Sequence, residues 1–170
     1  MRPIALWISA LVVAAGGAGL LRSAEGQMTP KEEAEAVMNA GIPFAQKMLA
    51  EHAEFYPFGF AMTAKNKVVP VAPSAPAEHP ASQQLIDDLA AAFRAGASSR
   101  EYKSTALFVD VRVQPPGKTE KTDAVQVGLE HVSGYCVDVF FPYSRDARGK
   151  VTFGDVFASQ RAGVVFGTCK

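Results

Sequence analysis

Three segments in the second half of the chain alternate between apolar and polar residues, and this pattern constrains the fold more than any other feature. They are STALFVDVRVQ at 104–114, DAVQVGLEHV at 123–132 and YCVDVFFPY at 135–143. A period of two is typical of β-strands. Short turns join the segments, PPGKTEKT at 115–122 and Ser133-Gly134. Because strands joined by short turns pair side by side in opposite directions, we expect an antiparallel sheet.

Two helices are predicted ahead of these strands. Thr29 and Glu32 form a capping box around Pro30, which suits the first position of a helix. Steps of three and four then define one helical face, made of Ala34, Val37, Met38, Gly41, Ala45, Met48, Leu49 and His52. Pro43 removes a backbone donor, so we expect one bent helix over about 30–52. A second helix is predicted over 82–97, with an apolar stripe of Leu85, Ile86, Leu89 and Phe93.

The stretch AEFYPFGFAM at 53–62 follows the first helix and has four aromatic residues among six. These aromatics line a binding pocket, or they are core residues at a corner between two elements. Pro57 ends a helix, and the alternation of Phe58, Phe60 and Met62 predicts a strand, so we favour the corner. KVVPVA at 67–72 is expected to return as an edge strand, because Pro70 cannot donate to a ladder.

The resulting element order is α-β-β-α-β-β-β, which predicts an α+β fold with an antiparallel sheet of about five strands and two main helices. We expect two layers, with both helices on one face of the sheet. A short helix is expected from Asp155 to about Ala162. The 170 residues are few enough for a single domain, which we place at 27–170. The element order resembles that of profilin-like folds, including the Roadblock and PAS groups, and this resemblance implies a fold alone.

Residues 1–26 have the layout of a secretory signal peptide. Arg2 precedes an apolar run from Ile4 to Leu21, and Ala24-Glu25-Gly26 is a usable cleavage site. We therefore expect a mature N-terminus near Gln27 and a periplasmic or secreted protein. The alternative is an uncleaved anchor in the inner membrane, because an 18-residue apolar run is just long enough to span a bilayer.

The two cysteines bear on the compartment of the protein, and the charge balance bears on its partners. Cys136 and Cys169 are the two cysteines of the chain, and an oxidising compartment favours a disulfide between them over two separate thiols. The chain has 17 basic and 17 acidic residues, and removal of residues 1–26 would leave a net charge of −1. We therefore expect no nucleic-acid partner, and contact with a membrane only through an uncleaved N-terminal segment.

Strand alternation predicts one face of the sheet under the helices and one mixed face. The covered face is expected to hold Leu107, Val109, Val111, Val113, Val125, Val127, Leu129, Tyr135, Val137, Val139 and Phe141. On the mixed face we expect a binding surface of Phe108, Asp110, Arg112, Glu130, Asp138 and Phe140, together with Gln126, Gly128 and Cys136. Asp110, Glu130 and Asp138 are also candidates for acid–base work, but we favour a solvated surface over catalysis for them.

The sequence contains no recognisable catalytic or phosphate-binding motif, and His52, His79 and His131 lack the spacing of a zinc site. We therefore expect no catalytic residue, metal or cofactor. The favoured function is an exported binding protein for an unknown protein or small ligand, one form of which is a periplasmic immunity or inhibitor protein. The alternatives are an envelope hydrolase that uses the three carboxylates, and a structural subunit of an envelope complex.

Overall fold

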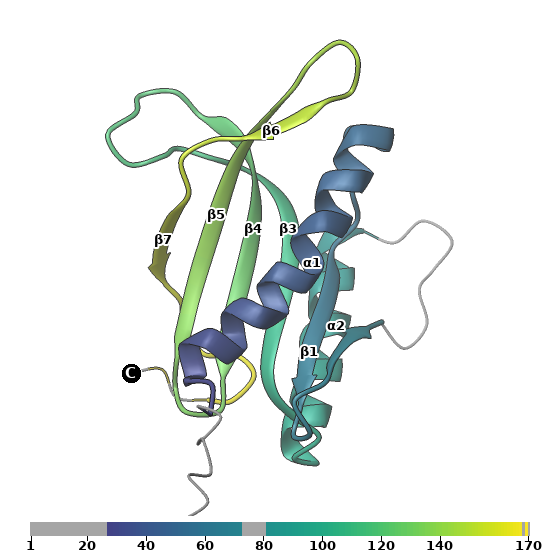
Figure 1. The fold of residues 1–170 in the computed structure, drawn as a ribbon, viewed down its shortest axis with the longest axis vertical. Helices are drawn as coiled ribbons and strands as arrows, with labels where there is room; N and C mark the ends of the chain where they lie inside the picture. Colours follow the sequence, from purple (N-terminus) through teal and green to yellow (C-terminus); the bar gives the residue numbers. More distant parts are fainter. Residues whose placement is uncertain (1–26, 73–80, 168, 170) are drawn as a thin grey trace, which may run out of the picture.

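The computed structural model describes residues 27–72, 81–167 and 169 (Figure 1). The predicted signal peptide and His79 lie outside the described residues. The elements are α1 (Pro30–His52), β1 (Phe58–Thr63), β2 (Val68–Val71), α2 (Ser82–Ser98), β3 (Tyr102–Val113), β4 (Thr122–His131), β5 (Cys136–Arg145), β6 (Val151–Phe153) and β7 (Phe157–Gln160). The α+β fold and the element order are confirmed, with seven strands instead of about five.

The strands form one antiparallel sheet in the order β2-β1-β3-β4-β5-β6, and β7 pairs with β5 beside β6. As predicted, the strand that contains Pro70 lies at an edge of the sheet. The segment after Asp155 differs from its prediction, because it forms β7 in place of a short helix. Its residues 157–160 hydrogen-bond to β5 instead of to each other.

Helix α1 begins as the capping box predicts. The Thr29 N–H donates to Glu32 Oε2 at 2.7 Å, and the Glu32 N–H donates to Thr29 Oγ1 at 3.3 Å. The helix continues through Pro43 and ends at Ala53, whose φ of 66° is left-handed. Such a residue stops the helix and turns the chain toward β1. Helix and strand thus meet at the corner predicted for the aromatic stretch.

The two helices lie on opposite faces of the sheet, so the prediction of two layers was wrong (Figure 1). Along β1, Phe58, Phe60 and Met62 pack in the core under α1. The intervening Ala61 packs with Leu89 and Phe93 of α2. Strands β1 and β3 hold apolar residues on both faces, so each face gains stability by being covered.

The same two-sided burial overturns the predicted orientation of β3. Phe108 lies opposite Val127 of β4, and Asp110 lies opposite Val125. Phe108, Asp110 and Arg112 therefore face the α1 side, whereas Leu107 faces α2. The predicted exposure of Phe108 was also wrong, because its side chain is completely buried and stacks on Phe58 with ring centroids 4.6 Å apart.

Close contact between α1 and the sheet depends on Gly41. A Cβ atom at this position would lie 2.2 Å from Phe108 Cζ, well inside van der Waals contact. The aromatic residues Phe58 and Phe60 surround the same ring from β1 and are partly buried. The absence of a side chain at Gly41 thus lets the helix approach an aromatic layer, and the prediction that Phe58 and Phe60 are core residues is confirmed.

We predict that Gly41→Ala destabilises the protein, although alanine is the better helix former. The added methyl must displace the Phe108 ring, and overpacking of this kind costs about 1–3 kcal/mol. Asn39→Ala is the matched control, because Asn39 is exposed on the same helix. Chemical denaturation of both variants measures the difference. A Gly41→Ala protein at least as stable as wild type would show that the helix does not sit this close to the sheet.

Candidate functional site

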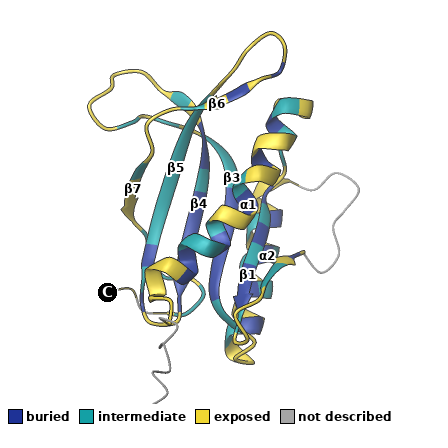
Figure 2. Ribbon diagram, in the orientation of Figure 1, coloured by how far each residue is buried: buried dark blue, intermediate teal, exposed yellow. Residues whose placement is uncertain are grey.

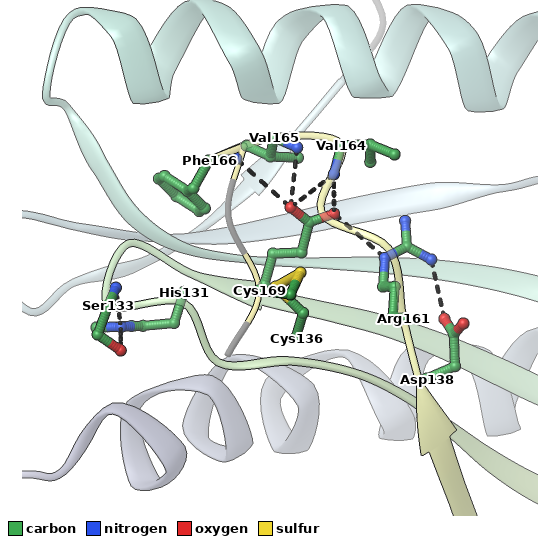
Figure 3. The surroundings of a disulfide bond; sticks show 10 residues. His131, Ser133, Cys136, Asp138, Arg161, Val164, Val165, Phe166 and Cys169 are labelled. Carbon is green, nitrogen blue, oxygen red and sulfur yellow. Dashed lines mark hydrogen bonds and ion pairs between the residues drawn. A yellow bond between two sulfur atoms is a disulfide. The ribbon is translucent and has the colours of Figure 1, made fainter.

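A buried carboxylate near the end of the central strand β4 holds the C-terminal segment in place. The Glu130 side chain is 1% exposed and accepts backbone hydrogen bonds from three consecutive residues, at 3.0 Å from Val164, 2.8 Å from Val165 and 3.5 Å from Phe166 (Figure 3). Carboxylates that accept several backbone N–H groups are strongly held. We call the described residues 161–167 and 169 the C-terminal strap.

An arginine and a disulfide fasten the strap further. Arg161 Nε lies 3.2 Å from Glu130 Oε1, and Arg161 Nη1 lies 2.9 Å from Asp138 Oδ1. The guanidinium rests on Gly128, where a Cβ atom would lie 2.5 Å from it. Cys136 and Cys169 form the predicted disulfide at the far end of the strap (Figure 3). The disulfide fits an oxidising compartment.

The strap therefore covers the α2-side face of the sheet at β4 and β5. Two of the predicted binding residues, Glu130 and Asp138, form ion pairs there with Arg161. Phe140 faces the same side and stacks on Phe157 of β7, with ring centroids 4.8 Å apart. These three residues contribute to the attachment of the last part of the chain.

The α1-side face is covered incompletely. Helix α1 packs chiefly on β1, β3 and β4, and less on β2 and β6. On β5, Arg145 at the end of the strand donates to the Leu49 and Ala50 carbonyls of α1 at 3.0 and 3.1 Å. Figure 2 shows β5 as mostly of intermediate burial beside the helix. The apolar and aromatic side chains left partly exposed here include Val139, Phe141 and Tyr143 of β5 and Phe153 of β6. We call these four residues the open strip.

Two predicted site residues border the open strip. Asp110 lies on β3, and Tyr143 reaches across β4 to donate its hydroxyl proton to Asp110 Oδ1 at 3.0 Å. Burial raises the pKa of Asp110, the charges of Asp123 and Glu54 raise it further, and the Tyr143 hydrogen bond opposes the rise. Arg112 is well exposed, and its Nε lies 3.9 Å from Asp123 Oδ1.

The six predicted binding residues are thus divided between the faces. Asp110 and Arg112 border the open strip, Phe108 is buried beneath α1, and Glu130, Asp138 and Phe140 lie on the strap side. Asp110 cannot act together with Glu130 and Asp138, because the sheet separates them. The structure does not assemble the three carboxylates into one acid–base site.

A second polar cluster was missed by the sequence reasoning. Glu33, on the buried face of α1, pairs with Lys103 and lies 2.9 Å from His131 Nε2. The Ser133 N–H donates to His131 Nδ1 at 3.0 Å, so Nε2 carries the proton that binds Glu33. Burial raises the pKa of Glu33, but its bonds to Lys103 and His131 outweigh this effect, and the net pKa is lowered. One sequence signal could have revealed this cluster. Glu33 lies four residues before Val37 and eight before Gly41, so a charged residue stands on the buried face of the helix.

This cluster adjoins a cavity of about 430 Å³ that is also lined by Gln27, Met28 and Pro30. Ser133 Oγ lies 2.8 Å from His131 Nδ1, which has the spacing of a nucleophile and its base. The backbone N–H groups of the turn are all occupied, however. Val132 donates to Lys103, Ser133 to His131 and Gly134 to His131. The N–H groups of Val132, Ser133 and Gly134 are thus not free for an oxyanion, and we interpret the cluster as a tie between α1 and the sheet.

The outer residues of the aromatic corner line another cavity, of about 330 Å³. Its lining residues are Met48, His52, Glu54, Phe55, Tyr56 and Ser82. Tyr56 is 60% exposed, whereas Phe58 and Phe60 pack inward. His52 lies at this exposed end of α1 and is not a core histidine. The corner therefore has a core side and a surface side.

The chain matches none of the family models, curated proteins or solved structures with which it was compared. Within the described ranges, no group of three or more His, Cys, Asp or Glu side chains is arranged to hold a metal ion. Neither α1 nor α2 has an apolar stretch that would cross a bilayer.

We predict that Glu130→Gln destabilises the oxidised protein by roughly 3 kcal/mol, the lower end of the cost of breaking a buried ion pair, because Arg161 keeps Asp138. The amide cannot supply the charge that the strap N–H groups and Arg161 require. Asp123→Asn is the control, and this exposed residue should change stability by less than about 0.5 kcal/mol. Denaturant titration without reductant measures both. Equal stabilities would show that the strap does not depend on Glu130.

Asp110→Asn should have the opposite effect. Because the pKa of Asp110 is raised, its charged form favours the unfolded state, and protonation favours the folded state as the pH falls. At neutral pH the neutral asparagine should leave stability unchanged or increase it, and any gain over wild type should shrink as the pH falls through the raised pKa. Asp138→Asn, which loses Arg161, should destabilise. If Asp110→Asn were less stable than wild type at neutral pH, the charged form of Asp110 would not be disfavoured in the folded protein.

Proposed function

We propose that the chain is an exported binding protein that receives a protein partner on the open strip. The observation that carries this proposal is the contrast between the two faces. The strap seals one face over β4 and β5, whereas the apolar strip beside α1 is left partly exposed. The strip is a row of partly exposed apolar side chains beside exposed charges, and an apolar centre with a charged rim is typical of an interaction site.

The charged rim supports binding more than catalysis. Arg112 and Asp123 are exposed beside the strip, and a guanidinium is favoured at interfaces because it pairs a carboxylate in two places. The hydrolase alternative needs cooperating carboxylates, which lie here on opposite faces. Within the class of binding proteins we favour a periplasmic immunity or inhibitor protein, whose partner is a toxin or enzyme that it occludes.

A second candidate is a small-ligand protein that uses the cavity at the aromatic corner. Its volume of about 330 Å³ and its lining by Met48, Phe55 and Tyr56 resemble a small ligand pocket. The cavity is shallow on the Tyr56 side, where the ring is largely exposed. The open strip combines more apolar side chains with charged neighbours than this cavity does. We therefore favour a protein partner on the strip over a small ligand in the cavity.

Site-specific photocrosslinking in the native host tests the proposal. A diazirine side chain at position 139 samples the open strip, and one at Ala91, exposed on α2, is the matched control. We expect one protein adduct from position 139 and none from position 91. Arg112→Ala should fold normally and reduce the adduct. Absence of an adduct at position 139, or the same adduct from both positions, would contradict docking on the strip.

A further inference from the structure

The disulfide and the Glu130 carboxylate fasten the strap at the same place. Glu130 of β4 lies directly opposite Cys136 of β5 in the sheet. We call the hydrogen bonds from the strap N–H groups to this carboxylate the Glu130 clasp. None of these bonds uses a sulfur atom, and Val165 also packs against the core cluster that contains Leu89 and Phe93 of α2. The clasp therefore needs no bond between the cysteines.

The clasp shortens the tether of Cys169. This cysteine follows Val165 by four residues, whereas it follows Arg161, which Asp138 also holds, by eight. The effective concentration of a tethered group falls roughly as the −3/2 power of the tether length, or more steeply. Halving the tether therefore raises the effective concentration of Cys169 at Cys136 by about threefold or more.

The shape of the strap directs the thiol as well. Gly167 has a φ of 89°, a left-handed conformation that glycine adopts without strain. The strap is folded closely on itself here, because a Cβ atom at Gly163 would lie 2.8 Å from Cys169 Sγ. Cys169 is exposed, whereas Cys136 is buried. An oxidant in solution therefore reaches Cys169 first.

We propose that the Glu130 clasp seats the strap before the disulfide forms, and that the disulfide then locks a cover that is already in place. In the reduced protein the clasp holds the Cys169 thiol near Cys136. This inference does not depend on the open strip or on its partner.

Closure is a thiol–disulfide exchange with a disulfide oxidant. The Cys169 thiolate attacks the oxidant and releases one of its halves as a thiol. The Cys136 thiolate then attacks Cys169 Sγ in the mixed disulfide and releases the second half. The two cysteine thiols lose two protons and two electrons, and the oxidant is reduced to two thiols. A reductant reverses both steps and leaves the strap seated.

Equilibration of the exported protein with reduced and oxidised glutathione tests this inference. Alkylation followed by intact-mass analysis gives the oxidised fraction, and hence the effective concentration of the two thiols. Glu130→Gln should lower this effective concentration at least threefold, because the nearest anchor of the strap is then Arg161. Asp123→Asn, the control at an exposed position, should leave it unchanged.

A second pair of variants leaves the buried charge in place. Val164→Pro removes the N–H group that contacts both Glu130 oxygens, and Val164→Ala retains it. Val164 is exposed, so neither change removes a core side chain. The proline variant should lower the effective concentration, and the alanine variant should match wild type.

Two results would overturn the inference. One is an unchanged effective concentration in Val164→Pro and in a folded Glu130→Gln protein. The other is an equal loss in Val164→Pro and Val164→Ala, because the N–H group would then not be what holds the strap. Circular dichroism shows whether each reduced variant is folded. If reduced Glu130→Gln is unfolded, the two Val164 variants decide the question alone.

Discussion

The buried carboxylate of Glu130 is the interaction on which the arrangement of the chain depends. It lies near the end of the central strand β4 and is buried, so a lone charge there would be costly. The strap removes that cost by providing Arg161 and backbone N–H groups, and the disulfide holds the strap's far end. The last residues of the chain are thereby required to cover β4 and β5 on the α2 side.

Once the strap and α2 share one face, α1 alone must cover the other. The helix packs chiefly on β1, β3 and β4, where Gly41 fits over Phe108, and makes fewer contacts with β2 and β6. The fourth strand of that face, β5, keeps its apolar side chains partly exposed. The open strip therefore results from having only two helices and the strap, among the described residues, to cover both faces of the sheet. This asymmetry is the physical basis of the proposed docking function.

Local signals in the sequence predicted the helices and strands well. Which side chains share a face of the sheet, and which face each helix covers, was harder to predict. The Thr29 capping box, the helix through Pro43, the edge strand with Pro70 and the disulfide all depend on residues near in sequence or on chemistry alone. The orientation of β3 depends on pairing with β4. In ALFVDV, at 106–111, both the odd and the even positions hold apolar residues. The alternation therefore does not say whether Leu107 or Phe108 faces α1. The Glu130 clasp requires backbone groups 34 and 35 residues away, which leave no pattern in the sequence.

Residue-resolved amide hydrogen exchange of the oxidised, exported protein tests the central claim most directly. Val164 and Val165 lie outside regular secondary structure, so their amides would exchange quickly unless a partner protects them. The Glu130 clasp predicts that both amides are protected to nearly the same degree as those of β4, and that Glu130→Gln removes this protection. Fast exchange of Val164 and Val165 in the wild-type protein would show that the strap does not seal this face, and would contradict the account.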